Sequence, residues 1–177
     1  QFYGETRPSE VESGKQYALA LSLHGASVDA KNQAGSYAPK DWIYHIAATN
    51  RRPFGFDWQA WGRRDALEVL DQALSEYPID PERVHLTGHS MGGHGTWHVG
   101  TLFPHLFATI GPSAGWINFE TYGGSPAPEG PFGWSQLHFD PRDFKENLID
   151  KAVYIIHGTA DDNVPIWHAE TMYELLE

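Results

Sequence analysis

A serine stands between two glycines in the segment Gly88-His89-Ser90-Met91-Gly92, which fits the pattern G-x-S-x-G. The residues before it, 83–87, have strand character, and residues 93–99 can open a helix that ends at Pro104. This pattern needs a sharp strand-to-helix turn, and its glycines let the backbone turn where a Cβ would clash. We therefore interpret Ser90 as a nucleophile, with an ordinary glycine-rich turn as the alternative.

A nucleophilic serine needs N–H groups that hold the oxyanion formed when its hydroxyl attacks a carbonyl. One donor is expected to be the backbone N–H of Met91, the residue after the nucleophile. The other is expected to be the N–H of Ala26, in the turn that follows the apolar run 17–23. The alternative for His24-Gly25 is a plain turn.

The serine also needs a carboxylate that orients its base, and residues 157–165 are the expected place for it. This segment follows the apolar run 152–156, so its side chains should lie at the same sheet edge as the nucleophile. Asp161 and Asp162 both stand there. Either could instead cap the following helix or hold the loop, so the residue types alone leave the choice open.

The sequence offers no clear candidate for the histidine that would act as the base for Ser90. After such a turn the carboxylate and then the histidine follow along the chain, and only His168 comes after Asp161. His168 falls in the first turn of the last predicted helix, whereas the base needs a separate loop beyond a further strand. We predict that His168 is a solvated helix residue, that His157 has a structural role, and that the catalytic histidine lies beyond Glu177.

Metal and cofactor chemistry find no support in the pattern. No His-x-x-x-His or His-Glu-x-x-His pair stands with a carboxylate on a predicted helix. Four histidines cluster in the sequence but run through a strand, a turn and a helix, so they should not converge on one ion: His85, His89, His94 and His98. We expect no metal and no organic cofactor.

Charge and composition limit the partners. The net charge is −11, which opposes binding to nucleic acid or to an anionic membrane, and no apolar stretch is long enough to span a bilayer. The absence of cysteine leaves the redox compartment undecided. Seven tryptophans and eight tyrosines fit core packing, with an aromatic cleft for sugars or phenolic groups as the alternative. The oligomeric state stays open.

Strand-like and helical segments alternate along the chain. The expected strands are 17–23, 42–48, 83–87, 108–111 and 152–156, and the expected helices are 66–77, 93–103 and 165–177. Long loops are expected at 50–62 and 116–139. This order predicts a single domain over 1–177, an α/β fold with a mostly parallel sheet and helices on both faces. Because 171–177 is helical without a stop signal, we expect a domain truncated at its C-terminus, without its final strand and catalytic-histidine loop.

The chain resembles the α/β-hydrolase superfamily, specifically its prolyl-oligopeptidase-like and esterase branch. Residues 77–93 resemble that branch's approach to the nucleophile, and 103–108 resemble the segment after the nucleophile helix. Residues 157–165 match its acid loop, with Asp161 in the place of the triad aspartate. Residues 50–58 are similar to a segment of bacterial members, and the closing Gly-His motif that carries the base has no counterpart.

This resemblance implies a serine hydrolase that cleaves esters or peptides. We favour an esterase that acts on a small-molecule or polysaccharide ester, including acylated carbohydrate. The alternatives are a serine peptidase, a non-catalytic binding module on the same fold, and a truncated chain that borrows strands from a partner. A periplasmic or secreted location is the expectation.

Overall fold

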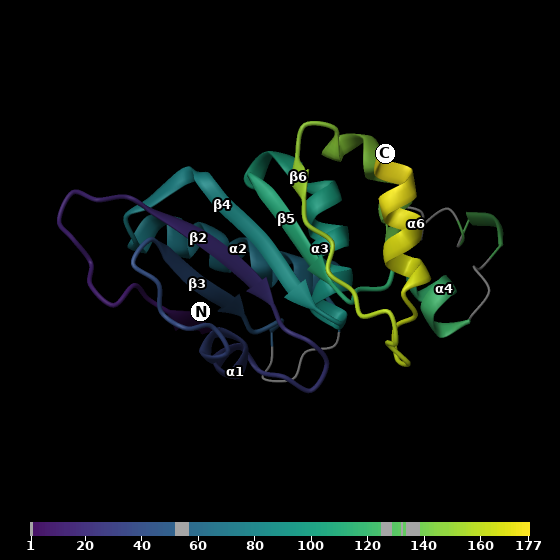
Figure 1. Cartoon of the computed structure of the whole chain (residues 1–177), viewed down its shortest axis with the longest axis horizontal. Helices are drawn as coiled ribbons and strands as arrows, with labels where there is room; N and C mark the ends of the chain where they lie inside the picture. Colours follow the sequence, from purple (N-terminus) through teal and green to yellow (C-terminus); the bar gives the residue numbers. More distant parts are fainter. Residues whose placement is uncertain (1, 52–56, 125–128, 132, 134–138) are drawn as a thin grey trace.

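The computed structural model describes residues 2–51, 57–124, 129–131, 133 and 139–177, and within them six strands form one mixed sheet (Figure 1). The strand order is β1-β3-β2-β4-β5-β6, with β1 antiparallel to β3 and every other pair parallel. The predicted mostly parallel sheet is confirmed. The strands are β1 (Tyr3–Thr6), β2 (Tyr17–Leu23), β3 (Ile43–Ala48), β4 (Ile79–His89), β5 (Thr109–Ser113) and β6 (Ala152–Val153).

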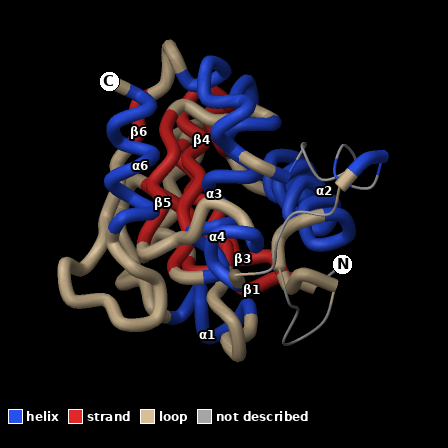
Figure 2. Tube along the Cα trace, turned by 90° about the vertical axis from the view of Figure 1, so that its right-hand side faces the viewer, coloured by secondary structure: helices blue, strands red, loops and turns tan. Residues whose placement is uncertain are grey.

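Helices cover both faces of this sheet, as Figures 1 and 2 show. The α-helices are α1 (Ala30–Gly35), α2 (Ala60–Glu76), α3 (Met91–Leu102), α4 (Phe119–Gly123) and α6 (Trp167–Leu176), and the 3-10 helices are η1 (Pro104–Leu106) and η3 (Pro141–Leu148). Side-chain alternation along β3 separates the two faces, because successive side chains point to opposite sides of a strand. Ala47 packs with Ala30 and Ala34 of α1, whereas its neighbours Ile46 and Ala48 join the main core cluster.

The main core lies between the sheet and the helices α2 and α3. On β2, three leucines, Leu19, Leu21 and Leu23, belong to this core, while Ala18 and Ala20 form a small cluster with Ile43 on the other face. Large side chains of β2 therefore fill one face of the sheet and small ones fill the other. Because both faces are buried, the strand reads as a continuous apolar run.

Several helices and strands begin or end at other residues than predicted. β4 and β5 extend further than expected, and α2 begins at Ala60, ahead of the periodic stretch 66–77. The last helix begins at Trp167, and regular pairing in β6 covers two residues, followed by a bridge between Ser113 and Ile156. The segment 116–139 is only partly described and contains α4; residues 52–56 of the predicted loop 50–62 lie outside the described residues.

Candidate active site

Ser90 occupies the turn between the end of β4 and the start of α3. Its backbone has φ 57° and ψ −117°, a conformation that a residue with a side chain rarely adopts. Two hydrogen bonds hold it there, from the N–H of Ser90 to the Ser113 carbonyl at 2.9 Å and from the N–H of His94 to the Ser90 carbonyl at 3.0 Å. Such strain costs on the order of 1–3 kcal/mol and clusters at functional sites. Ser90 itself is half-buried.

The glycines of this turn allow close contact with neighbouring strands. A Cβ on Gly92 would overlap the carbonyl oxygen of Leu23, at the end of β2, and a Cβ on Gly88 would overlap the Gly92 carbonyl. Gly93 is packed in the same way against the carbonyl of Ser113. The turn is therefore fixed between the carboxyl ends of β2 and β5.

The turn after β2 lies beside Ser90. A Cβ on Gly25 would lie 3.8 Å from the Cβ of Ser90, and the next residue, Ala26, is exposed. Met91 is the first residue of α3, so its N–H is one of the first-turn donors that have no acceptor within the helix. The positive end of the helix dipole adds to this environment. The oxyanion roles of the Met91 and Ala26 N–H groups stay predictions.

Asp161 lies in the loop after β6, at the same carboxyl edge of the sheet. Its Oδ1 accepts hydrogen bonds from the N–H of Val164 at 2.9 Å and of Asn163 at 3.0 Å. The bond from Val164 is the largest influence that lowers the pKa of Asp161. The nearby imidazoles of His157 and His89 lower this pKa further, so the carboxylate remains ionised at neutral pH.

The second carboxylate oxygen of Asp161 is placed differently. Oδ2 lies 3.5 Å from Nε2 of His157, while that nitrogen donates its proton to the Val164 carbonyl at 2.7 Å. His157 therefore braces the acid loop, which confirms the structural role expected for it. The neighbouring Asp162 is exposed, with no hydrogen bond recorded among the described residues.

His168 is buried, and the expectation that it is solvated was wrong. Its Nδ1 accepts a hydrogen bond from the N–H of Ile117 at 3.2 Å, and its ring stacks on Trp167 with centroids 3.8 Å apart. Among the described residues no hydrogen bond joins it to Ser90 or Asp161. Its buried Nε2 has no hydrogen-bond partner within the described part of the chain, and neither has the buried Nε1 of Trp116.

A buried histidine, to which the sequence assigned no catalytic or metal-binding role, lies on helix α3. His94 stands one turn after Ser90; its Nδ1 donates to the Trp116 carbonyl at 3.1 Å, and its Nε2 accepts from Gln59 at 3.2 Å. The Asp57 carboxylate lies 3.4 Å from the same nitrogen. The only sequence signal was a histidine on the nucleophile helix. Three His, Asp or Glu side chains arranged to hold a metal ion are not found among the described residues.

The burial of His168 predicts a pH-dependent stability. Burial lowers its pKa from 6.5 to about 4, with smaller contributions from His157 and His94. Between these values the unfolded chain binds more protons, so the free energy of unfolding should fall as pH falls from 6.5 to 4, by about 3 kcal/mol for this residue. Urea unfolding at several pH values measures this loss. His168→Gln should reduce the slope of the unfolding free energy against pH, whereas His105→Gln, at an exposed position, should leave it unchanged. Equal slopes for the wild type and His168→Gln would contradict a lowered pKa of His168.

The geometry defines a class of protein. A strained serine between strand and helix, at the carboxyl edge of a mostly parallel sheet and beside an acid loop, is the arrangement of the α/β-hydrolase fold. Residues 50–177 match the sequence model of the prolyl oligopeptidase family, and the chain belongs to this family.

Similar proteins include both peptidases and esterases. An uncharacterized secreted protein of Arthroderma benhamiae is 29% identical over 96% of this chain and 21% of its own length. The uncharacterized peptidase YuxL of Bacillus subtilis is 27% identical over 97% of this chain and 30% of its own length. A bifunctional acetylxylan esterase/xylanase of Neocallimastix patriciarum is 32% identical over 55% of this chain and 16% of its own. The chain thus spans less than a third of each relative.

Solved structures share the fold. A thermostable esterase superposes with a TM-score of 0.73 and 21% identity, over 97% of this chain and 46% of the other. An acylaminoacyl peptidase also gives 0.73, with 17% identity over 97% of this chain and 32% of the other. The predicted α/β-hydrolase fold is confirmed. Among the helices that the structure describes, none is both long and apolar enough to cross a membrane.

Proposed function

We propose that this chain is the catalytic portion of a serine hydrolase that cleaves carboxylic esters. The observation that carries the proposal is the backbone of Ser90, which is held at φ 57° at the edge of the sheet where Asp161 also lies. Hydrogen bonds to β5 and α3 hold the backbone of Ser90 in this strained conformation. A nucleophilic serine needs such a turn because it keeps the hydroxyl clear of the strands.

The proposed reaction follows from the placement of these groups. Ser90 Oγ attacks the ester carbonyl and gives its proton to a histidine, while the N–H groups of Met91 and Ala26 hold the oxyanion. Asp161 orients this histidine through Oδ2, because Oδ1 is already occupied by two backbone N–H groups. The histidine then protonates the leaving alcohol, and water hydrolyses the acyl-enzyme by the same steps.

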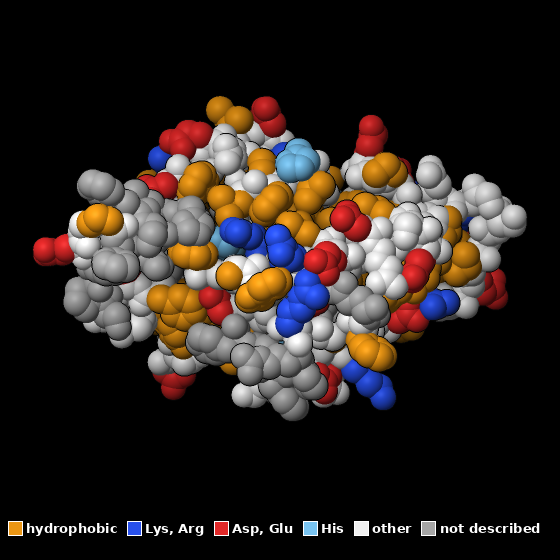
Figure 3. All heavy atoms as spheres, turned by 180° about the vertical axis from the view of Figure 1, so that it is seen from behind, with side chains coloured by type: hydrophobic (Ala, Val, Ile, Leu, Met, Phe, Trp, Pro, Cys, Tyr) orange, Lys and Arg blue, Asp and Glu red, His pale blue; other side chains and the backbone are white. Residues whose placement is uncertain are grey.

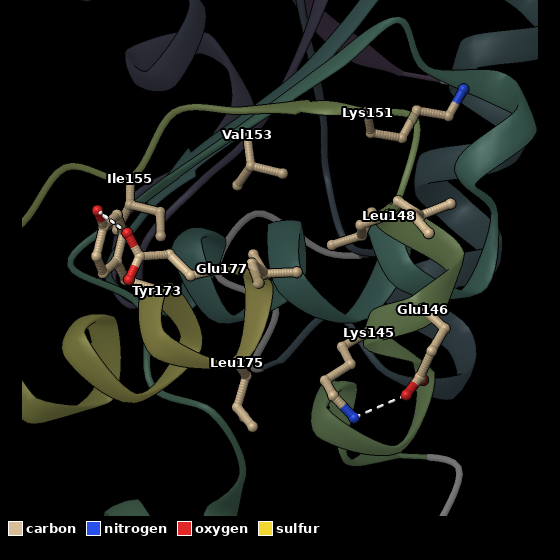
Figure 4. A pocket seen from close by; sticks show the side chains of 11 residues that line it. Lys145, Glu146, Leu148, Lys151, Val153, Ile155, Tyr173, Leu175 and Glu177 are labelled. Carbon is tan, nitrogen blue, oxygen red and sulfur yellow. Dashed lines mark hydrogen bonds and ion pairs between the residues drawn. The ribbon is translucent and has the colours of Figure 1, made fainter.

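We propose that a segment of the same polypeptide outside these 177 residues supplies the histidine. A hollow of about 480 Å³ lies between η3, β6 and α6, and Figure 4 shows Val153 and Ile155 of the β6 segment on one side of it, with Leu148 of η3 across from them. β6 is the sheet edge, and Tyr154 and the bridged Ile156 bond to β5. The alternate residues Val153 and Ile155 therefore direct their backbone groups outward, where a further strand could pair.

The neighbouring exposed side chains support the same proposal. Tyr154 is 72% exposed and Ile156 is 48% exposed on the opposite side of this edge strand. A strand added at β6, followed by a covering element, would bury them and bring its own carboxyl end next to Asp161. A strand from a partner molecule is the alternative occupant of this edge.

The substrate test compares acetate release from an acetylated oligosaccharide with cleavage of unblocked and blocked peptides by the full-length polypeptide. We expect acetate release without peptide cleavage, in line with the acetylxylan esterase among the relatives. Peptide cleavage without acetate release would support the peptidase alternative, in line with YuxL. Turnover of neither would contradict catalysis. We also propose a secreted location, since one relative is described as secreted.

A further inference from the structure

Trp61 is a large aromatic side chain that the active site does not use. It stands in the first turn of α2 and is 64% exposed. Two guanidinium groups lie near its ring, with Cζ of Arg64 at 5.3 Å and Cζ of Arg51 at 5.9 Å from the ring centroid. Figure 3, which looks onto the face opposite that of Figure 1, shows basic, acidic and hydrophobic side chains gathered together near the middle of this face.

Two hollows meet at this tryptophan. One has a volume of about 670 Å³ and is also lined by Asn50, Asp57 and Gln59. The other has a volume of about 540 Å³ and is also lined by Arg64, Glu68 and Asp71. Ala60 and Trp61 line both of them. The indole therefore forms a wall shared by two adjoining sites, which suits a ligand made of repeated units.

The polar groups around Trp61 are held in place before any ligand binds. Nη2 of Arg51 lies 2.7 Å from the Glu68 carboxylate, and its Nε lies 3.6 Å from the buried carboxylate of Asp65. The side-chain amide of Asn50 donates to the backbone carbonyl of Asp57. A fixed set of polar groups loses little entropy on binding, so it can select a ligand by hydrogen-bond geometry.

Backbone strain is concentrated around the larger hollow. Four residues with side chains have positive φ here: Asn50 at 57°, Arg51 at 68°, Asp57 at 72° and Ala60 at 41°. All four line the hollow of about 670 Å³. Strained residues persist where the surrounding structure fixes them, and they cluster at binding sites.

These groups select the chemistry of the ligand. Trp61 is 64% exposed although Arg51 and Arg64 lie over its ring, so part of the indole surface is open to the C–H face of a sugar ring. Side-chain amides, guanidinium groups and carboxylates bind pairs of hydroxyl groups. The two linings hold three arginines (Arg51, Arg63 and Arg64) and three carboxylates (Asp57, Glu68 and Asp71), so their formal charges balance. The net charge of −11 opposes an anion. A purely apolar ligand would leave the charged groups without compensation. A neutral, hydroxyl-rich chain fits both the indole surface and the polar groups around it.

The lining of the larger hollow contacts helix α3, which begins at the residue after Ser90. The N–H of Asp57, which lines the hollow, contacts Sδ of Met91 at 2.8 Å, and Met91 is the residue after Ser90. Gln59, also in the lining, bonds to His94 on the nucleophile helix. We propose that Trp61 and its two hollows form a subsite for a neutral polysaccharide chain that leads to Ser90. This inference rests on the proposed ester hydrolase and names its substrate class.

Binding of unmodified oligosaccharides tests the subsite without catalysis. Xylohexaose and cellohexaose are titrated by calorimetry into the full-length Ser90→Ala protein. We expect at least one of them to bind, and Trp61→Ala in the same background to weaken binding by about tenfold or more. Trp42→Ala is the matched control, because Trp42 is also half exposed, at 51%, but lies before β3 and away from both hollows.

The outcomes separate this inference from the proposed function. No binding at millimolar concentration, or equal affinity with and without the Trp61 ring in a variant whose circular dichroism is native, would overturn the subsite. Hydrolysis of p-nitrophenyl acetate by the wild-type protein tests the hydrolase by itself. If the ester is cleaved and no sugar binds, the subsite fails and the hydrolase stands. If a sugar binds through Trp61 and no ester is cleaved, the subsite stands and the hydrolase fails.

Discussion

Replacing Ser90 by alanine should lower kcat/KM for p-nitrophenyl acetate by about 10⁴-fold or more in the full-length polypeptide. The loss is large because the hydroxyl forms the covalent bond, and no neighbouring group can take its place in a turn this tight. Alanine keeps the Cβ, so the hydrogen bonds to the Ser113 carbonyl and from His94, which use only the backbone of residue 90, should persist. Steady-state hydrolysis measures the effect, and circular dichroism checks the fold.

Ser75→Ala is the matched control for this variant. Ser75 is exposed on α2, and its hydroxyl bonds only to the nearby Gln72 carbonyl at 2.7 Å, so its loss should leave hydrolysis unchanged. Retention of more than about a tenth of the activity in Ser90→Ala would contradict a covalent mechanism at this residue.

Asp161→Asn should lower kcat by about 10³- to 10⁴-fold, because an amide cannot stabilise the imidazolium or hold the required tautomer. The amide oxygen can still accept from the N–H groups of Val164 and Asn163, so the loop should keep its shape. The effect is read from steady-state rates of the full-length polypeptide on a soluble ester.

Asp162→Asn is the control, since it makes the same change one residue along. Asp162 is exposed, so this substitution should alter kcat by less than about twofold. The opposite pattern, with Asp162→Asn inactive and Asp161→Asn active, would assign the triad acid to Asp162 and overturn the proposed geometry.

Local signals explain which parts of the fold the sequence could predict. The turn at Ser90 was readable because its glycines, the strand before it and the helix after it stand together within about fifteen residues. The elements missed among the described residues are β1, α1, α4 and the 3-10 helices η1 and η3. β1 is a four-residue edge strand that pairs antiparallel with β3, α1 is a six-residue helix capped by Asp29, and α4 has five residues. These three are too short for periodicity to mark them.

A long-range contact explains the wrong expectation for His168. It has a polar side chain in an amphipathic segment, so the sequence alone indicated solvent, but the side chain is buried and bonds to Ile117, fifty-one residues earlier.

The residue types left the choice between Asp161 and Asp162 open. Among the described residues, Asp161 accepts hydrogen bonds from the N–H groups of Val164 and Asn163, and Asp162 is exposed. Trp61 gave no signal until the fold placed two arginines beside it.

Mapping the site of covalent modification is the sharpest test of Ser90 as the nucleophile. The full-length polypeptide is treated with a fluorophosphonate probe and digested, and the labelled residue is identified by mass spectrometry. We expect a single modified residue, Ser90, and no labelling of the Ser90→Ala variant. Absence of the adduct on folded wild-type protein, or an adduct on another serine that persists in Ser90→Ala, would contradict the assignment of this strained residue as the nucleophile.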